Sequence, residues 1–204
     1  MNREELVAHI QSLPKVIVEL GCGPDKQTGA IGIDHLPLPG VDFVADLEGG
    51  LPFLPDNSVD EFFSRHVLEH IENFEFLMKE IHRTLRPGGV KRIYVPHFSN
   101  PHYYSDFTHK RFFGLYSFDY FSRPAHQLRR KVPAFYVDFH FKVVNRRLIF
   151  KSPDFPLRHF FKSKILEPIF NLNSWWQEWY EESFCYIFPC QEIEFIIEPE
   201  KQSC

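Results

Sequence analysis

Apolar and polar positions alternate along the first half of the chain in short runs that predict buried strands and their connections. The predicted strands are bounded by Gly, Pro, Asn or Asp and cover 15–20, 30–33, 41–45, 59–63 and 90–95. Apolar residues three and four positions apart predict a helix over 74–85, and a shorter helix is expected over 3–12. Strands joined by helical or loop crossovers predict an α/β fold with a mostly parallel sheet, whose ligand sites lie at the carboxyl ends of the strands.

The second half of the chain has a different pattern. Long β-type runs cover 135–150 and 192–197, and an aromatic segment over 155–188 lies between them. No internal repeat or low-complexity linker divides the 204 residues. We therefore predict one domain over 1–204.

Composition places the chain among ordinary globular proteins. Hydrophobic residues at 44% and charged residues at 25% exclude global disorder, and no apolar run nears the ~20 residues that cross a bilayer. The polar, acidic start lacks the apolar region of a signal peptide. The cysteines are too scattered for a disulfide scaffold or a paired-cysteine zinc site; they are Cys22, Cys185, Cys190 and Cys204. A reduced, cytoplasmic protein is expected.

Charge is distributed unevenly. Residues 1–122 hold 11 Lys and Arg against 17 Asp and Glu, 123–164 hold 11 against two, and 165–204 hold one against eight. The basic stretch either offers a surface to an anionic partner or is neutralised by the acidic parts in the fold. Because the chain is acidic overall and has no recognition motif, no nucleic-acid partner is expected.

Acidic residues mark the ends of three predicted strands: Glu19, Asp34 and Asp46. In a doubly wound sheet these positions line one crevice, and Gly21 and Gly23 let the backbone approach a ligand closely. Carboxylates there suit hydroxyls, amines or a cation, and they repel phosphate. The turn also lacks the third glycine of a dinucleotide fingerprint and the Gly-Lys-Ser/Thr of a P-loop. Only 24–29 separate this turn from the next strand, which is too short for an ordinary crossover helix.

These motifs together resemble class I S-adenosylmethionine-dependent methyltransferases of the type 11 kind. The segment Glu19-Leu20-Gly21-Cys22-Gly23-Pro24 is similar to the first motif of that family, and the segments over 63–70 and 85–90 resemble its later motifs. The match covers 15–96, with a shortened first crossover. The resemblance implies a Rossmann-like three-layer sandwich whose sheet ends in an antiparallel pair formed by 135–150 and 190–198.

The resemblance also implies S-adenosylmethionine as cofactor, with Asp34 holding its ribose and Asp46-Leu47 contacting its adenine. It makes 15–96 the cofactor-binding half and 97–134 and 151–190 the substrate or lid segments. The implied cofactor residues are Glu19, Gly21, Cys22, Gly23, Asp34, Asp46, Leu47 and His66.

A competing motif lies within the same half. The segment His66-Val67-Leu68-Glu69-His70 spells the inverted zinc-peptidase signature. On a helix it would place two imidazoles on one face, where they could share a metal with a third ligand. A zinc hydrolase is therefore an alternative, although the family resemblance already accounts for this segment and no metal site is predicted.

The loop after the strand at 90–95 holds the candidate catalytic residues His97, Asp106 and His109. Beside the expected methyl donor, an imidazole could deprotonate a hydroxyl or amine acceptor. If the loop is helical, Asp106 and His109 share a face and the carboxylate orients the imidazole. Two readings stay open beside this one: Asp106 caps a short helix with His109 folding back, or the three residues hold a metal.

Basic and aromatic residues over 155–180 favour a substrate lid or a homodimer interface, with peripheral membrane contact as the other reading. The expected function is methyl transfer to a small-molecule, lipid or glycan acceptor that the sequence does not name. Since the methyl donor is already activated, the protein's task is to align the acceptor and, where needed, remove its proton. A non-catalytic cofactor-binding module is a further alternative.

Overall fold

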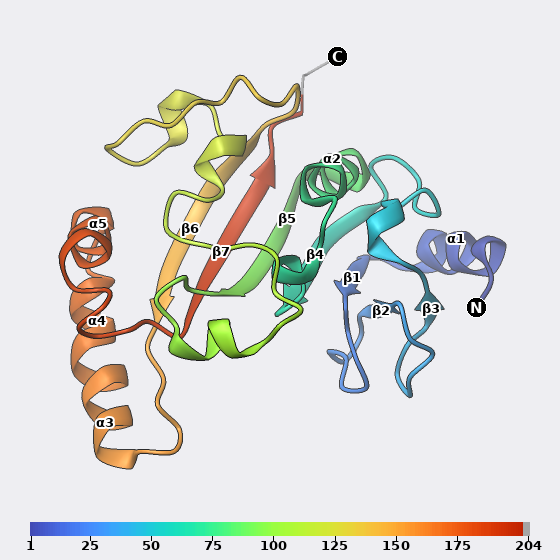
Figure 1. Cartoon of the computed structure of the whole chain (residues 1–204). Helices are drawn as coiled ribbons and strands as arrows, with labels where there is room; N and C mark the ends of the chain where they lie inside the picture. Colours follow the sequence, from blue (N-terminus) through green and yellow to red (C-terminus); the bar gives the residue numbers. More distant parts are fainter. Residues whose placement is uncertain (202–204) are drawn as a thin grey trace.

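The structure is a computed structural model that describes residues 1–201, and a seven-stranded sheet runs through its centre (Figure 1). The strand order is β3-β2-β1-β4-β5-β7-β6. The strands are β1 (Ile17–Leu20), β2 (Ile31–Asp34), β3 (Phe43–Val44), β4 (Val59–Arg65), β5 (Leu85–Pro96), β6 (Phe141–Ile149) and β7 (Glu192–Pro199).

Strand direction confirms the predicted architecture. β3, β2, β1, β4 and β5 are parallel neighbours, whereas β7 pairs antiparallel with both β5 and β6. The predicted pair of C-terminal strands is therefore present at one edge of the sheet. The seven-stranded, mostly parallel sheet with helices around it is a Rossmann-like α/β fold.

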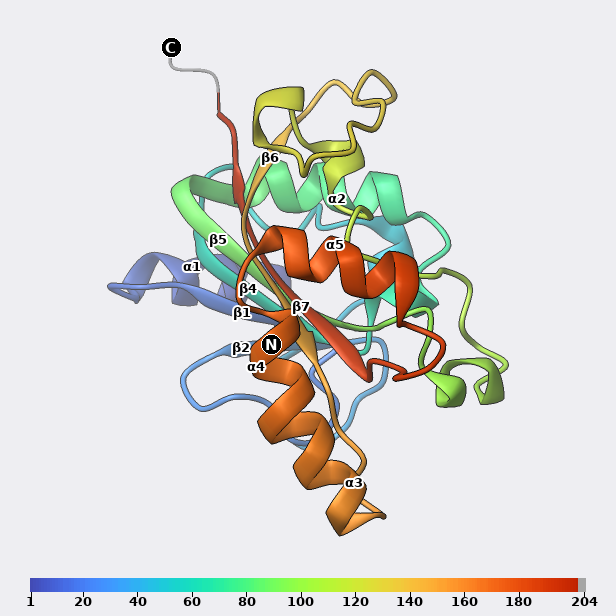
Figure 2. The same cartoon turned by 90° about the vertical axis from the view of Figure 1, so that its left-hand side faces the viewer.

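The helices are α1 (Arg3–Ser12), α2 (Phe74–Thr84), α3 (Pro156–Phe161), α4 (Glu167–Phe170) and α5 (Ser174–Ser183). A π-helical segment, Lys162–Leu166, joins α3 to α4, so that the three segments form one continuous helix on the outside of the molecule (Figure 2). The predicted helix over 74–85 ends one residue early, because Leu85 is extended and begins β5. Its apolar face packs into the core through Leu77, Met78 and Ile81.

The connection between β1 and β2 contains no helix, as its length predicts. The Glu19 carboxylate accepts a hydrogen bond of 2.6 Å from the backbone N–H of Gln27 and so fixes this short loop to the sheet. The turn therefore leads directly to β2 and brings the ends of the two strands together.

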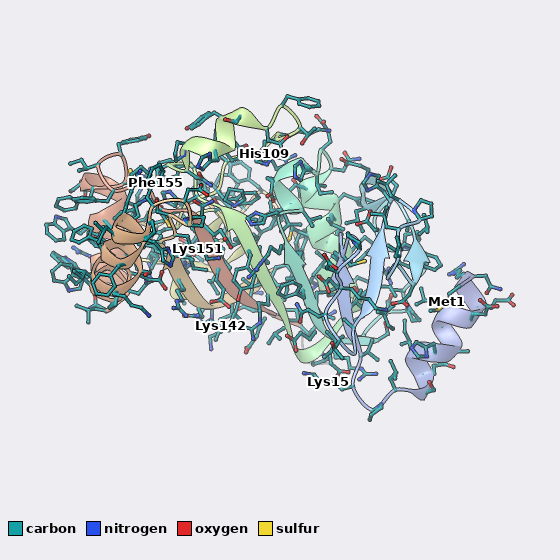
Figure 3. All side chains as sticks on the ribbon, turned by 90° about the horizontal axis from the view of Figure 1, so that it is seen from below. Met1, Lys15, His109, Lys142, Lys151 and Phe155 are labelled. Atoms are coloured by element: carbon teal, nitrogen blue, oxygen red, sulfur yellow. The ribbon has the colours of Figure 1, made fainter. Side chains whose placement is uncertain are left out.

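The segment over 97–134 forms only short 3-10 turns. Some of its aromatic residues pack inward, whereas Tyr104, Phe107 and Phe112 are exposed. Phe113 and Phe118 stack with ring centroids 5.9 Å apart, and Phe118 contacts Phe195 of β7. Figure 3 shows His109 on this segment, beside the sheet, with Phe155 and Met1 toward opposite ends of the molecule. Many of the aromatic side chains beyond residue 97 are thus core residues.

The β-type run predicted over 135–150 becomes a strand only from Phe141. Before it, Phe135 and Tyr136 are exposed, and Asp138 pairs with Lys79 of α2 on the surface. Among residues 1–201, no helix is long and apolar enough to span a membrane. The described cysteines, Cys22, Cys185 and Cys190, are free and buried, and Cys204 lies outside the described residues.

Candidate functional site

A cleft of about 510 Å³ lies at the carboxyl ends of β1, β2 and β4. Parallel strands of this fold present their ligand sites at that edge. The cleft is lined by Gly21, Asp34, His35, Asp46, Leu47, Glu48, His66, Val67, His70, Ile71 and Thr108. Five of the predicted cofactor residues are therefore brought together: Gly21, Asp34, Asp46, Leu47 and His66.

Asp34 is fixed by the backbone around it. Its Oδ2 accepts a hydrogen bond from the Gly23 N–H (2.9 Å) and its Oδ1 accepts one from the Leu36 N–H (3.1 Å). The residue is buried, so its side chain is held in one orientation at the wall of the cleft. His35 Nδ1 also lies 3.0 Å from Oδ1, whereas Oδ2 accepts only the Gly23 N–H and keeps a second lone pair, which suits a ligand that donates hydrogen bonds, such as a diol.

The other wall is built from Asp46 and the 3-10 turn that follows it. The Asp46 carboxylate accepts a hydrogen bond of 3.0 Å from the Glu48 N–H, which caps the turn Leu47–Gly49. Leu47, Val67 and Ile71 are buried residues of the core that also line the cleft. An apolar floor beside two carboxylates accommodates a flat, apolar ring joined to hydroxyl groups.

Gly21 has a positive φ of 63° and lies directly against Val67. A Cβ at position 21 would lie 2.3 Å from Val67 Cγ2, closer than real contacts allow. The glycine is needed here both for its backbone conformation and for the close approach of the two segments.

Glu19, Cys22 and Gly23 do not line the cleft; they support it from behind. Glu19 is buried, and desolvation raises the pKa of its carboxyl group despite the Gln27 hydrogen bond and the charge of Lys91. Burial, together with the nearby carboxylates of Asp34 and Glu19, raises the pKa of the Cys22 thiol to about 11, so Cys22 is a neutral packing residue. Gly23 acts through its N–H group on Asp34.

The zinc-peptidase interpretation required a helix through 66–70, and the structure has none there. His66 follows β4 with a φ of 55°, and Leu68–His70 is a single 3-10 turn. The His66 and His70 side chains both reach the cleft, but they are not stacked on one helical face. The sequence match alone is therefore misleading about the geometry.

His97 is completely buried, contrary to its predicted role as a base. Its Nδ1 accepts a hydrogen bond from the Ser99 N–H (3.0 Å), so Nε2 carries the proton and faces Glu181 Oε2 at 3.3 Å. Neither nitrogen is free to take a proton from an acceptor. The structure assigns His97 to linking the loop after β5 with α5.

Asp106 and His109 do meet, with 3.6 Å between Asp106 Oδ2 and His109 Nε2, but not on a helix. The 3-10 turn Pro101–Ser105 ends before them. Asp106 accepts hydrogen bonds from the N–H (2.9 Å) and hydroxyl (2.6 Å) of Thr108, and these bonds lower the pKa of its carboxyl group. The helix that would place the two residues on one face is absent, but the carboxylate and the imidazole are still neighbours. His97 lies apart from this pair, so the three do not form one metal site.

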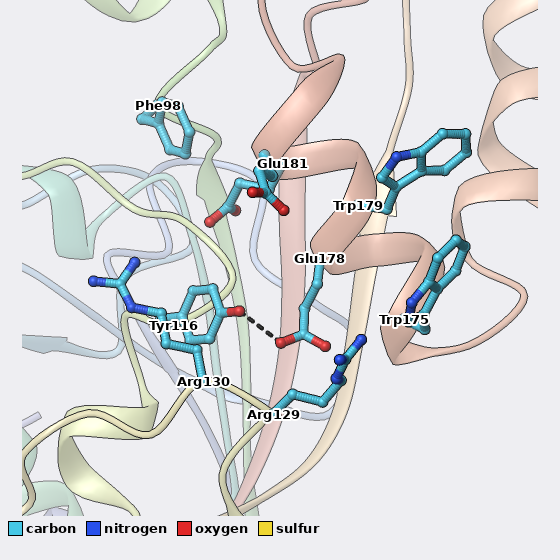
Figure 4. A pocket seen from close by; sticks show the side chains of 9 residues that line it. Phe98, Tyr116, Arg129, Arg130, Trp175, Glu178, Trp179 and Glu181 are labelled. Carbon is cyan, nitrogen blue, oxygen red and sulfur yellow. Dashed lines mark hydrogen bonds between the residues drawn. The ribbon is translucent and has the colours of Figure 1, made fainter.

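A second, larger pocket of about 710 Å³ lies between the two predicted substrate or lid segments (Figure 4). Phe98, Tyr116, Arg129 and Arg130 come from 97–134, and α5 contributes Trp175, Glu178, Trp179, Glu181 and Glu182. The Tyr116 hydroxyl donates a hydrogen bond of 2.6 Å to Glu178. None of the predicted cofactor residues lines this pocket, so it is separate from the cleft.

Sequence reasoning missed several lining residues of the cleft: His35, Glu48, Val67, His70, Ile71 and Thr108. Three of them, His35, Glu48 and Val67, directly follow predicted cofactor residues in the chain, so proximity to a strand end was an available signal. Thr108 had no such signal, because the loop that carries it reaches the cleft only in the folded chain.

Comparison with known proteins agrees with this geometry. A family model described as a methyltransferase domain matches residues 32–93. Trans-aconitate 2-methyltransferase from Azoarcus sp. strain BH72 is 32% identical over 100 residues, which cover 39% of this chain and 38% of that protein. The chain thus spans well under half the length of the curated relative that it matches.

Two solved structures share the fold over nearly the whole chain. The YcgJ protein from Bacillus subtilis has a TM-score of 0.53 at 14% identity and covers 99% of this chain and 100% of its own. A SAM-dependent methyltransferase from Archaeoglobus fulgidus has a TM-score of 0.53 at 16% identity, with 97% and 94% covered. These two structures show the fold that this chain shares, and residues 32–93 are similar to a methyltransferase domain.

Proposed function

We propose that this chain transfers a methyl group from S-adenosylmethionine to a small or medium-sized acceptor. The observation that carries the proposal is the cleft itself, where Gly21, Asp34, Asp46, Leu47 and His66 meet at the ends of β1, β2 and β4. The curated relative is named for a small tricarboxylic acid, which supports a small-molecule acceptor.

The residues present fit this cofactor. Asp34 would hold the ribose hydroxyls with its remaining lone pairs, and Leu47 and Ile71 would contact the adenine. When bound, the cofactor supplies a methyl group on a positively charged sulfur. The acidic character of Asp34, Asp46 and Glu48 favours a cationic ligand and disfavours a phosphate.

Two variants at Asp34 test the cofactor assignment. Asp34→Ala removes about two charge-assisted hydrogen bonds to the ribose, worth on the order of 3 kcal/mol, and should weaken S-adenosylmethionine binding about a hundredfold. It also frees the Gly23 and Leu36 N–H groups, so a loss of about 1–3 kcal/mol of stability is expected.

Asp34→Asn keeps one backbone acceptor and is the gentler test. Calorimetric titration with S-adenosylmethionine should show weaker binding in both variants, while circular dichroism confirms that each is folded. Unchanged affinity in a folded Asp34→Ala protein would place the cofactor elsewhere.

The acceptor side is proposed to lie near Thr108 and His70, where the loop carrying Asp106 and His109 meets the cleft. Incubation with methyl-labelled cofactor and a fractionated metabolite and lipid extract would identify the acceptor. Cofactor binding with no labelled product from any fraction would favour the non-catalytic cofactor-binding module.

A further inference from the structure

Glu69 is an unusual residue for a protein interior. Its side chain is fully buried, and neither carboxylate oxygen has a hydrogen-bond partner. His66 Nδ1 lies 3.3 Å from Oε1, but the geometry is not that of a hydrogen bond. A buried carboxylate without a partner is costly, so a group that compensates its charge is expected at this point.

Two imidazoles surround this carboxylate. One ligand atom each from Glu69, His70 and His109 lies within 4.8 Å of the others, and the two histidine rings have centroids 4.8 Å apart. The three residues come from two segments that are 39 positions apart in the chain, the turn after β4 and the loop after β5. The fold therefore adds His109 to two donors that are neighbours in the chain, Glu69 and His70.

Hydrogen bonds set the tautomers of both histidines. His109 Nδ1 lies 2.9 Å from the Tyr103 carbonyl oxygen, which can only accept, so Nδ1 carries the proton and Nε2 keeps its lone pair. The Thr108 hydroxyl donates to Asp106 Oδ1 (2.6 Å), so at His70 Nδ1 (2.9 Å) it acts as acceptor and His70 Nε2 also keeps its lone pair. Metal-binding histidines are typically oriented in this way, with the second ring nitrogen donating to a carbonyl or another oxygen.

We propose that Glu69, His70 and His109 bind a divalent transition-metal ion at the wall of the cleft. One carboxylate and two neutral imidazoles suit Zn²⁺, Mn²⁺ or Fe²⁺ better than Mg²⁺ or Ca²⁺, which prefer oxygen ligands alone. Asp106, whose Oδ2 lies 3.6 Å from His109 Nε2, is placed to supply further negative charge.

The place of the site explains how it would serve the cleft. His70 and Thr108 line the cleft, and Glu69 lies behind them, so an ion held by the three ligands would adjoin the ligand space. With three protein ligands, an ion of this class keeps open positions for oxygen atoms of another molecule. The site stands independently of the proposed methyl transfer, because its ligands can be tested with the metal alone.

The test is titration of the tag-free, chelator-treated full chain with Zn²⁺ and, separately, Mn²⁺. Calorimetry should give one site per chain, and Mn²⁺ should lose its free electron paramagnetic resonance signal on binding. Glu69→Gln and His109→Gln should each weaken binding at least about a hundredfold, since even loss of a residue that only orients a ligand costs about 10–100-fold. Thr108→Val should weaken metal binding by about 10–100-fold, because Thr108 only orients His70 through a hydrogen bond.

His126→Gln is the matched control, because His126 is half-exposed and pairs with Glu200 outside the site (3.0 Å). It should bind like the wild type. The Glu69→Gln variant has a second signature: it removes a buried charge, so without metal it should melt higher than the wild type, and added metal should no longer raise its melting temperature.

Absence of binding to the wild type would overturn the proposal, as would equal binding by all four variants. If Glu69→Gln fails to fold, His109→Gln and Thr108→Val still decide the outcome. S-adenosylmethionine titration of the same proteins separates this result from the proposed function, since the cofactor residues Asp34 and Asp46 are unchanged in all of them.

Discussion

At the scale of single residues, the interior of the sheet holds an unusual pair of ionisable groups. Lys91 of β5 is fully buried and donates a hydrogen bond of 2.6 Å to the Ser64 hydroxyl on β4. Burial lowers the pKa of Lys91 well below its usual value, although the nearby carboxylate of Glu19 on β1 opposes this. The same desolvation raises the pKa of Glu19.

Lys91 should make the stability of the protein depend on pH, in a direction that follows from its lowered pKa. In the unfolded chain Lys91 binds a proton up to its ordinary pKa of 10.5, whereas in the folded chain it releases the proton at lower pH. Between these two values the unfolded state binds more protons, so the free energy of unfolding rises with pH. In urea unfolding, the free energy of unfolding of Lys91→Met should not rise with pH in this way. The control variant Lys142→Met, at an exposed position, should still show the rise.

The comparison is made by measuring both variants and the wild type at about pH 7 and about pH 9. The advantage of Lys91→Met over the wild type should shrink toward the higher pH. Parallel pH profiles for Lys91→Met and the wild type would mean that Lys91 is charged in the folded protein.

Single residues also show where sequence reasoning succeeds. Asp34 and Asp46 could be predicted as cleft residues because each follows a buried strand, and the strand determines where the carboxylate lies. His97 also follows a strand, yet its partner Glu181 lies 84 positions away on α5 and buries it. The missing information was long-range packing, which no local pattern contains.

At the scale of elements, the turn after β1 depends on two glycines under different constraints. Gly21 and Gly23 both have positive φ angles, 63° and 56°. A Cβ at Gly21 would collide with Val67, whereas a Cβ at Gly23 meets nothing within 4 Å. The two positions thus separate backbone strain from steric collision.

Gly23→Ala should cost only backbone strain, about 1–2 kcal/mol of stability. Gly21→Ala should cost more, because the methyl group also displaces Val67 from the cleft wall, and it should weaken S-adenosylmethionine binding strongly. Urea unfolding and calorimetry measure the two effects. Gly21→Ala with Val67→Ala should regain part of the loss, and equal behaviour of the two glycine variants would show that Val67 does not constrain the turn.

The elements that sequence reasoning located best are those with strong local patterns. Apolar runs predicted all the parallel strands, and the spacing of Leu77, Met78 and Ile81 predicted α2. No helix or strand could be predicted within 97–134, because the 3-10 turns of this segment depend on the packing of Phe113 and Phe118 against other parts of the chain. The start of β6 was misplaced because exposed Phe135 and Tyr136 resemble strand residues.

At the scale of the whole molecule, one buried ion pair fastens the 97–134 segment to the sheet. Asp119 is fully buried and pairs with Arg146 of β6, whose side chain is 9% exposed. Arg146 Nε also donates to the Leu115 carbonyl oxygen (3.2 Å), and the Leu128 N–H donates to Asp119 (3.2 Å). Desolvation raises the pKa of Asp119 and lowers that of Arg146, against the attraction between the two charges.

Removing one charge should therefore cost more than removing both. Arg146→Met leaves a buried carboxylate unpaired and should lower the free energy of unfolding by about 3–5 kcal/mol, whereas Arg146→Met with Asp119→Leu should recover most of that loss. Urea unfolding of the two single variants and the double variant measures the coupling.

Because the unpaired Asp119 would bind a proton more readily in the folded state, the loss in Arg146→Met should be smaller at acidic pH. S-adenosylmethionine affinity should change far less than stability, since Thr108 is the single cleft-lining residue from 97–134. A parallel collapse of affinity and stability would instead mean that the segment and the cofactor cleft fold and bind as one unit.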